Sequence, residues 1–219
     1  MLNQFSIDWN NLYKKHPSQY LTGSAIIVEK DANAKNKRFT INLSEAVSFP
    51  SKQFNGYDMF GALTNCNCDG VLLVSNQDGT YDMLYIEMKS RFSSDEVFKA
   101  KRQIVGTYTK MQSLLQIMKA YKNLLVQQVI GIIETKELDT DQENWWQKRQ
   151  MLPDNDMEFG ELLLKYTTIE VDTKCKKELN MPEKMVFSII LSDKDNYTMD
   201  NYSVYKQNLT IHSVFSSVI

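Results

Sequence analysis

The sequence predicts an α/β fold in which a central mixed β-sheet is flanked by helices. Two observations lead to this prediction. Several short runs rich in β-branched residues precede a long amphipathic stretch of helical period, and an apolar strand follows that stretch almost at once. The chain has 219 residues, 42% of them hydrophobic, and no linker rich in Pro, Gly or Ser divides it. We therefore expect a single domain over residues 1–219.

The first third of the chain predicts a helix, a hairpin and a loop. Apolar residues recur near helical spacing within residues 7–20, and the pattern breaks before Pro17, so we expect a short helix there. Ser24–Glu29 and Arg38–Leu43 are β-branched runs separated by a polar stretch, which predicts two paired strands. Pro50–Asn67, which contains an Asn-Gly pair, is expected to be loop or turn.

The middle of the chain carries the strongest pattern. Val71–Val74, an Asp-Gly turn and Tyr81–Met88 predict an antiparallel hairpin. A capping-box sequence begins at Ser93, and the apolar stripe behind it predicts a long helix to about Lys122. Val129–Ile133 is then expected to be a buried strand.

The last third predicts fewer regular elements. The polar residues 137–156, which include Trp145-Trp146, are expected to form a loop or an irregular helix. Beyond them we expect a helix at Glu161–Thr167, a strand at Met185–Leu191 and a C-terminal strand at Asn208–Phe215.

Charge and cysteine content restrict the classes of function. A net charge of −2 and a pI near 5.8 give no overall basic surface, so any contact with nucleic acid must come from a local patch. Cys66, Cys68 and Cys175 have neither the spacing of a zinc site nor that of a disulfide framework, which indicates a reducing compartment. No signal-peptide pattern and no long apolar run occurs, so we expect a cytoplasmic protein without membrane contact.

Three residues in the middle of the chain are expected to meet at one edge of the sheet. Glu87 and Lys89 lie two residues apart on a predicted strand, so their side chains project from the same face. Asp69 stands just before the paired strand, and the hairpin returns it towards the strand end that holds Glu87.

This combination of residues suits phosphodiester hydrolysis. Mg²⁺ binds proteins through one or two carboxylates and keeps its other positions for water and phosphate oxygens. Asp69 and Glu87 are therefore the candidate metal ligands, with Mn²⁺ expected to substitute for Mg²⁺. Lys89 is the candidate group that orients the attacking water or stabilises the developing negative charge.

The acid-x-Lys triplet is weak evidence on its own, because it occurs at three places. These are Glu87-Met-Lys89, Glu134-Thr-Lys136 and Asp172-Thr-Lys174. Only the first ends a strand that follows an Asp-headed strand and precedes a capped helix, and the second triplet ranks behind it. The alternative interpretation is that Asp69 caps a turn and that Glu87 and Lys89 form an ion pair on a solvated strand face.

The segment from Asp69 to Ile133 resembles the PD-(D/E)xK nuclease superfamily, which has the restriction-endonuclease-like fold. The similarity lies in the order of CDGVLLV, a turn, LYIEMKS and a helix carrying KRQIVGTY. It implies a nuclease-like core at about residues 24–135, followed by a C-terminal elaboration at about 136–219. It also implies that Asp69 and Glu87 bind the metal and that Lys89 is catalytic.

Further roles follow from the same resemblance. Some branches of the superfamily place a Gln on the next helix, a position that Gln103 occupies, and a Tyr four residues later, whereas Tyr108 lies five residues on. Cys68 stands where the name-giving motif has Pro. Many members add an upstream acid, for which Glu29 and Glu45 are both candidates.

The function implied is a Mg²⁺-dependent endonuclease that hydrolyses DNA, in restriction or another defence against foreign DNA, acting as a homodimer or with a partner subunit. One alternative is a non-catalytic interaction protein that retains the fold. Another is a nuclease acting on RNA or on branched or single-stranded DNA. On the long helix, four basic residues are either a nucleic-acid-binding edge or a solvated face. They are Lys99, Lys101, Arg102 and Lys110.

Overall fold

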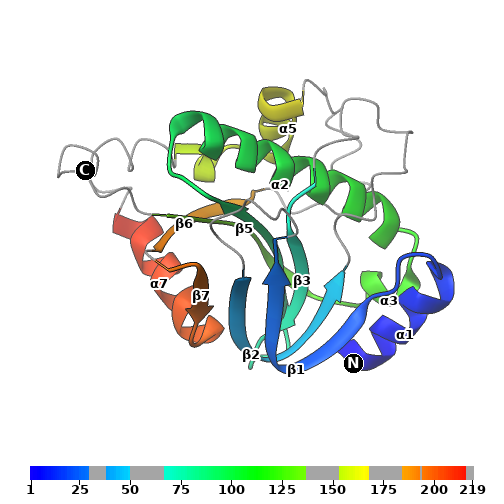
Figure 1. Ribbon diagram of the computed structural model, residues 1–219. Coiled ribbons are helices and arrows are strands. Elements are labelled where there is room, and N and C mark those ends of the chain that lie inside the picture. The colour runs from blue at the N-terminus through cyan, green and yellow to red at the C-terminus, as the bar shows by residue number, and fades with distance from the viewer. Residues whose placement is uncertain (30–37, 50–66, 137–152, 168–183, 193, 216–219) are drawn as a thin grey trace.

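The computed structural model, shown in Figure 1, describes residues 1–29, 38–49, 67–136, 153–167, 184–192 and 194–215. It is an α/β protein in which a mixed seven-strand sheet packs against helices, as the sequence predicted. The strands are β1 (Gln19–Val28), β2 (Arg38–Phe49), β3 (Gly70–Ser75), β4 (Tyr81–Lys89), β5 (Val126–Lys136), β6 (Val186–Ser192) and β7 (Asn196–Met199). The helices are α1 (Leu2–Leu12), α2 (Ser94–Leu115), α3 (Lys119–Lys122), α5 (Phe159–Thr167) and α7 (Tyr202–Phe215), and residues Pro153–Asp156 form a short 3₁₀ helix.

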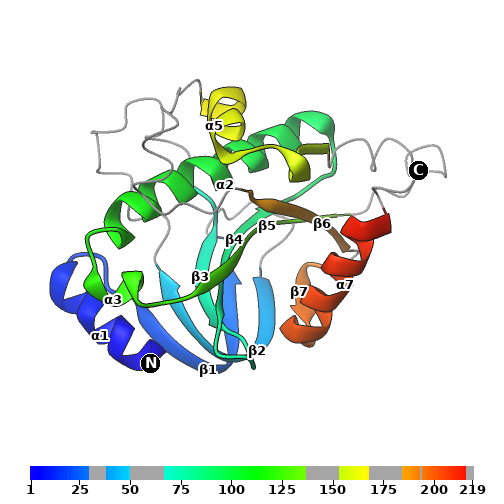
Figure 2. The same ribbon diagram turned by 180° about the vertical axis from the view of Figure 1, so that it is seen from behind.

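The sheet is curled. Its strands run in the order β1-β2-β3-β4-β5-β6, antiparallel from β1 to β4 and parallel from β4 to β6. β7 follows β6 after only a few residues, yet it pairs with the beginning of β2, while β3 pairs with the end of β2. The chain therefore returns from β6 at one edge of the sheet to β2 near the other edge. β7 and α7 lie beside β2 in Figures 1 and 2.

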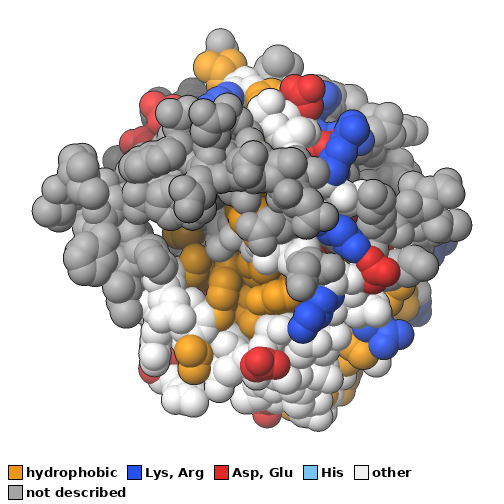
Figure 3. Space-filling view, turned by 60° about the vertical axis from the view of Figure 1, so that its left-hand side comes forward, with side chains coloured by type: hydrophobic (Ala, Val, Ile, Leu, Met, Phe, Trp, Pro, Cys, Tyr) orange, Lys and Arg blue, Asp and Glu red, His pale blue; other side chains and the backbone are white. Residues whose placement is uncertain are grey.

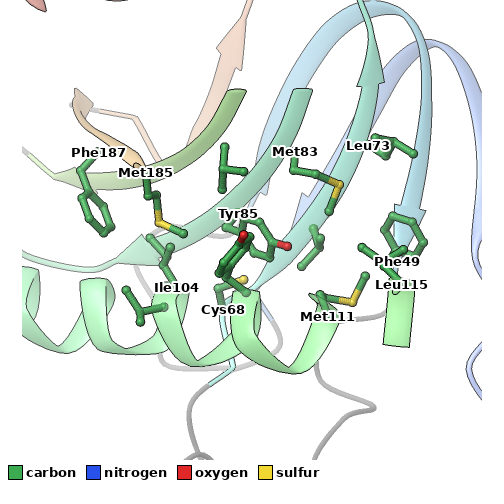
Figure 4. Close-up of a cluster of buried hydrophobic side chains, with 14 of the residues drawn as sticks. Phe49, Cys68, Leu73, Met83, Tyr85, Ile104, Met111, Leu115, Met185 and Phe187 are labelled. Carbon is green, nitrogen blue, oxygen red and sulfur yellow. The ribbon is translucent and has the colours of Figure 1, made fainter. Parts of the chain in front are cut away.

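The two faces of the sheet carry separate apolar cores. On one face, which we call the α2 face, side chains such as Met83 and Tyr85 pack against α1, α2 and α5. On the other, the α7 face, Leu84 and Ile86 pack with Tyr202 of α7. Figure 4 shows part of the first core between the sheet and α2. Since alternate residues of β4 point to opposite faces, the period-2 prediction for this strand is confirmed.

The long helix begins where the capping-box pattern predicted. The Ser93 side chain accepts a hydrogen bond from the backbone N–H of Glu96 at 3.3 Å, and two acidic residues in the first turn suit the positive end of the helix. The helix ends at Leu115, earlier than the predicted Lys122, and the short α3 follows after a break.

The predicted hairpins are confirmed, whereas the N-terminal helix differs from its prediction. The turn between β3 and β4 contains Gly79 with φ of 80°, which a glycine adopts without strain. β1 and β2 pair over longer ranges than predicted. Helix α1 begins at Leu2 and ends at Leu12, earlier than the predicted residues 7–20. Beyond it, Trp9 Nε1 donates to His16 O at 2.7 Å and β1 begins at Gln19.

The predicted strand at Asn208–Phe215 is wrong, because these residues belong to helix α7. Asn201 starts the helix by accepting hydrogen bonds from the N–H groups of Ser203 and Val204. Tyr202 is buried on the sheet and so fixes the helical turn. The β-branched composition of this segment favoured a strand, but the cap and the packing determine a helix. Strand β7 was not predicted.

The other predicted elements divide into two groups. The strands at Val129–Ile133 and Met185–Leu191 and the helix at Glu161–Thr167 are confirmed within β5, β6 and α5. The predicted loop at Pro50–Asn67, apart from its last residue, and the Trp145-Trp146 pair lie outside the described residues. In the described part of the chain, no helix combines the length and the apolar character that crossing a membrane requires.

Candidate active site

Glu87 and Lys89 lie side by side on the α2 face, near the end of β4. Lys89 Nζ donates to Glu87 Oε1 at 2.7 Å and to Gln103 Oε1 of α2, also at 2.7 Å. A third oxygen, Glu96 Oε2, lies 3.9 Å from the same ammonium. Glu87 is 2% exposed and Lys89 is 7% exposed, so this ion pair is not on a solvated strand face.

Asp69 is held at the same end of β4. Its backbone N–H donates to Ile86 O at 2.9 Å, and its Oδ2 accepts from the backbone N–H of Met88 at 2.9 Å. The two bonds join Asp69 to the residues immediately before and after Glu87. The carboxylates of Asp69 and Glu87 are therefore neighbours. The hairpin thus brings together Asp69, Glu87 and Lys89, as the order of the strands predicted.

Helix α2 holds the segment that precedes Asp69. Gln103 Nε2 donates to Asn67 O at 2.9 Å, and the backbone N–H of Cys68 donates to Thr107 Oγ1 at 2.8 Å. Lys110 Nζ donates to Asn67 Oδ1. Sequence reasoning gave no role to Asn67 or Thr107, because nothing in the local pattern shows that the helix meets this segment.

Glu87 has an unusual electrostatic environment. Burial raises the pKa of its carboxyl, the neighbouring Asp69 charge raises it further, and Lys89 opposes both, which leaves the pKa at about 8. Glu87 Oε2 is buried and has no hydrogen-bond partner among the described residues. A buried carboxylate oxygen without a partner is costly unless a cation or a proton occupies it.

Of the two upstream acids, Glu29 is the one near the site. Its charge contributes to the raised pKa of Glu87, whereas Glu45 is hydrogen-bonded to Tyr20. A glycine makes this approach of β1 possible. A Cβ at Gly70 would lie 2.5 Å from Ile27 Cγ1, so only glycine lets the end of β1 lie against the residue that follows Asp69.

The donor set is small but of the right type for a hard cation. Within the described residues, no group of three or more His, Cys, Asp or Glu side chains gathers closely enough to hold a metal ion. Asp69 and Glu87 nevertheless offer two adjacent carboxylates, one with a buried oxygen to which no described residue donates a hydrogen bond. Mg²⁺ commonly uses one or two protein carboxylates and keeps several waters. The residues therefore fit Mg²⁺ or Mn²⁺.

Two of the four basic residues on α2 do not face solvent. Lys101 is buried and pairs with Asp154 Oδ2 at 2.8 Å, and Lys110 is buried beside Asn67. Only Lys99 and Arg102 of this set are exposed. On the face shown in Figure 3, Lys and Arg side chains lie among Asp and Glu side chains along one side of an apolar area. The described side chains of this face therefore form no continuous basic surface.

Two further candidate residues, Tyr108 and Cys68, are buried in the core. Tyr108 is buried against Tyr85 with ring centroids 5.6 Å apart, so it belongs to the core. Burial raises the pKa of the Cys68 thiol, with the Glu87 charge as a further cause, so Cys68 is an unreactive core residue. Cys66 and Cys175 lie outside the described residues.

The other acid-x-Lys triplets do not join the site. Glu134 is in register with Met88 and faces the α7 side of the sheet, and Lys136 pairs with Asp195. The triplet at 172–174 lies outside the described residues. The chain matches no protein-family model, no curated protein and no solved structure.

Proposed function

We propose that this protein is a metal-dependent nuclease that hydrolyses phosphodiester bonds in DNA, built on a restriction-endonuclease-like core. One observation carries the proposal. Glu87 Oε2 is buried without a hydrogen-bond partner among the described residues, while Asp69 lies beside it and the Lys89 ammonium is fixed on the other carboxylate oxygen. The site thus combines two carboxylates and one lysine, and Glu87 Oε2 is the oxygen that could bind a cation.

A second cluster in the same chain shows what a purely structural ion pair looks like. The Asp154 carboxylate accepts from Lys165 on one oxygen and from Lys101 and Tyr166 on the other. Burial by itself would raise its pKa, but these donors lower the pKa to about 2. Glu87 has the opposite character, since one of its oxygens has no partner in the described part of the chain and its pKa is raised to about 8. Perturbation of this kind is common at functional sites.

The roles follow from the contacts. Asp69 and Glu87 would hold Mg²⁺ or Mn²⁺, and the bound ion supplies polarisation of the phosphate and a lowered pKa of the attacking water. Lys89 presents a fixed ammonium next to these carboxylates, where it stabilises negative charge that develops on the phosphate oxygens. Gln103 holds the ammonium in place through its carbonyl oxygen.

DNA as the substrate and defence against foreign DNA as the setting rest on the resemblance of residues 69–133 to the PD-(D/E)xK superfamily. Contacts to phosphates position a nucleic acid without distinguishing its sequence. The test of the substrate therefore has to compare duplex DNA, single-stranded DNA and RNA directly.

The proposal is tested by incubating plasmid DNA, single-stranded DNA and RNA with Mg²⁺ or Mn²⁺, with EDTA as the metal control. Lys89→Met is compared with Lys101→Met, which also removes a buried lysine but one that pairs with Asp154. We expect metal-dependent cutting by the wild type and by Lys101→Met, and cutting about 100- to 1,000-fold slower by Lys89→Met. Absence of cutting by folded wild-type protein on all three substrates would contradict the proposal and favour a non-catalytic binding protein.

A further inference from the structure

Three side chains on one stripe of α2 contact the same short segment of chain. Gln103, Thr107 and Lys110 are spaced so that they share one face of the helix. The segment is Asn67–Asp69, which we call the 67–69 segment. Gln103 Nε2 donates to Asn67 O, Thr107 Oγ1 accepts from Cys68 N, and Lys110 Nζ donates to Asn67 Oδ1.

The opposite side of the 67–69 segment is held by β4. Asp69 N donates to Ile86 O, and Asp69 Oδ2 accepts from Met88 N, both at 2.9 Å. The segment is therefore clamped between a helix and a strand, with a hydrogen bond from or to each of its three residues. The position of the Asp69 carboxylate relative to Glu87 depends on this clamp.

The same contacts determine the orientation of the Gln103 amide. A backbone carbonyl only accepts hydrogen bonds and a lysine ammonium only donates them. The Gln103 NH₂ group must therefore face Asn67 O, and its carbonyl oxygen must face Lys89 Nζ. Turning the amide by 180° would lose both bonds, so the place of Asn67 decides which atom of Gln103 meets Lys89.

Lys110 is not a residue that packing alone would favour. Its side chain is 1% exposed, and burying an ammonium costs free energy that a methionine of similar length would not incur. The ammonium ends on the side chain of Asn67, one residue from Cys68 and two from Asp69. A charge buried at this point is explained if it fixes the 67–69 segment.

We propose that Asn67, Thr107 and Lys110 are positioning residues of the site, which set Asp69 and, through Gln103, the Lys89 ammonium relative to Glu87. The inference rests on the proposed nuclease function. It adds three residues that act through Asp69, Gln103 and Lys89. Partners of this kind, which orient metal ligands, typically account for about 10- to 100-fold in metal affinity or activity.

Thr107→Val and Lys110→Met test the proposal with little change of shape. The first removes the acceptor for the Cys68 N–H, and the second removes the donor to Asn67. Thr107→Ser restores the hydroxyl. Thr109→Val is the control for the first change, because the Thr109 hydroxyl donates to Val105 O within the same helix. Lys101→Met is the control for the second.

The readouts are Mn²⁺ affinity by isothermal titration calorimetry, the Mn²⁺ signal in electron paramagnetic resonance, and kcat and KM for DNA cleavage. We expect Thr107→Val and Lys110→Met to weaken Mn²⁺ binding and to lower kcat by about 10- to 100-fold while KM for DNA changes little. Thr107→Ser should return both values towards those of the wild type. Thr109→Val and Lys101→Met should leave them unchanged.

Wild-type Mn²⁺ affinity and kcat in both test variants would overturn the inference, as would equal losses in the controls. If Thr107→Val or Lys110→Met does not fold, Asn67→Ala at a half-buried position takes its place, with the same two expectations. Failure of the proposed function is distinguishable, because then the wild type itself neither binds Mn²⁺ nor cuts, and the positioning role falls with it.

Discussion

Lys89 Nζ lies 2.7 Å from Glu87 Oε1, and the two side chains project from the same face of β4 although both are almost entirely buried. The pair leaves Glu87 Oε2 without a hydrogen-bond partner among the described residues, next to the charge of Asp69. A buried ion pair is weak evidence for stability, because desolvation offsets much of the attraction. The proposed cation site at Glu87 would account for the arrangement.

Loss of Lys89 is expected to separate metal binding from catalysis. Lys89→Met keeps the two carboxylates, so Mn²⁺ should still bind, because a bound cation favours the ionised form of Glu87. The rate of DNA cleavage under single-turnover conditions should fall about 100- to 1,000-fold, the usual effect of removing a group that stabilises developing charge. Calorimetry and a cleavage time course measure the two effects. A parallel loss of Mn²⁺ binding would mean that Lys89 supports the fold of the site rather than the reaction.

Without metal, stability is expected to fall as the pH rises. The pKa of Glu87 is raised from 4.5 to about 8, so between these values the folded state binds more protons than the unfolded state. Its favourable contribution is complete below pH 4.5 and is lost as the pH rises through about 8. The wild type should therefore lose about 1 kcal/mol of unfolding free energy between pH 7 and pH 9 that Glu87→Gln does not lose.

Urea unfolding of both proteins at several pH values measures this difference, with Mg²⁺ absent. Groups remote from Glu87 titrate alike in the two proteins and cancel. A difference that stays constant from pH 6 to pH 9 would show that Glu87 has an ordinary pKa.

The Asp154 cluster is expected to affect stability and not cleavage. Lys101, Lys165 and Tyr166 hold the folded-state pKa of Asp154 at about 2, below its ordinary 3.8. This contribution is present above pH 3.8 and is lost as the pH falls through about 2. Asp154→Asn should cost about 2 kcal/mol at pH 7 while the cleavage rate is retained. Chemical denaturation and the cleavage assay provide the comparison, and an inactive but folded Asp154→Asn would assign the cluster to the site.

Gly70 is expected to tolerate no side chain while Ile27 is present. A Cβ at this position would lie 2.5 Å from Ile27 Cγ1, so Gly70→Ala should destabilise the protein by about 1–3 kcal/mol. Combining it with Ile27→Ala should make the total loss smaller than the sum of the two single losses. A double-mutant cycle of thermal unfolding measures the coupling, and additive losses would argue against the close approach of β1 to Asp69.

Local sequence signals predicted the parts of the site that lie close together in the chain. The two-residue period put Glu87 and Lys89 on one face of a strand, and the Asp-Gly turn returned β4 to Asp69. The contacts of Asn67 with Lys110 and of Cys68 with Thr107 join residues about 40 positions apart, and no local pattern encodes them.

Local sequence patterns could not predict the curl of the sheet either. Strand β7 is four residues long and is defined by its pairing with β2, more than 150 residues earlier in the chain. The same curl brings Glu29 near Glu87, which is why the sequence could not choose between Glu29 and Glu45. At Asn208–Phe215 the β-branched composition pointed to a strand, but these residues continue helix α7, which is capped by Asn201.

The most direct test compares Mg²⁺-dependent DNA cleavage at pH 8.5 by the wild type, Glu87→Gln and Glu134→Gln. Both substitutions neutralise a buried acid on neighbouring strands, but Glu134 faces the α7 side of the sheet. Circular dichroism confirms that each variant is folded. The proposed site predicts that the wild type and Glu134→Gln cut at the same rate and that Glu87→Gln does not cut. Cleavage by Glu87→Gln at the wild-type rate, or none by the wild type, would contradict it.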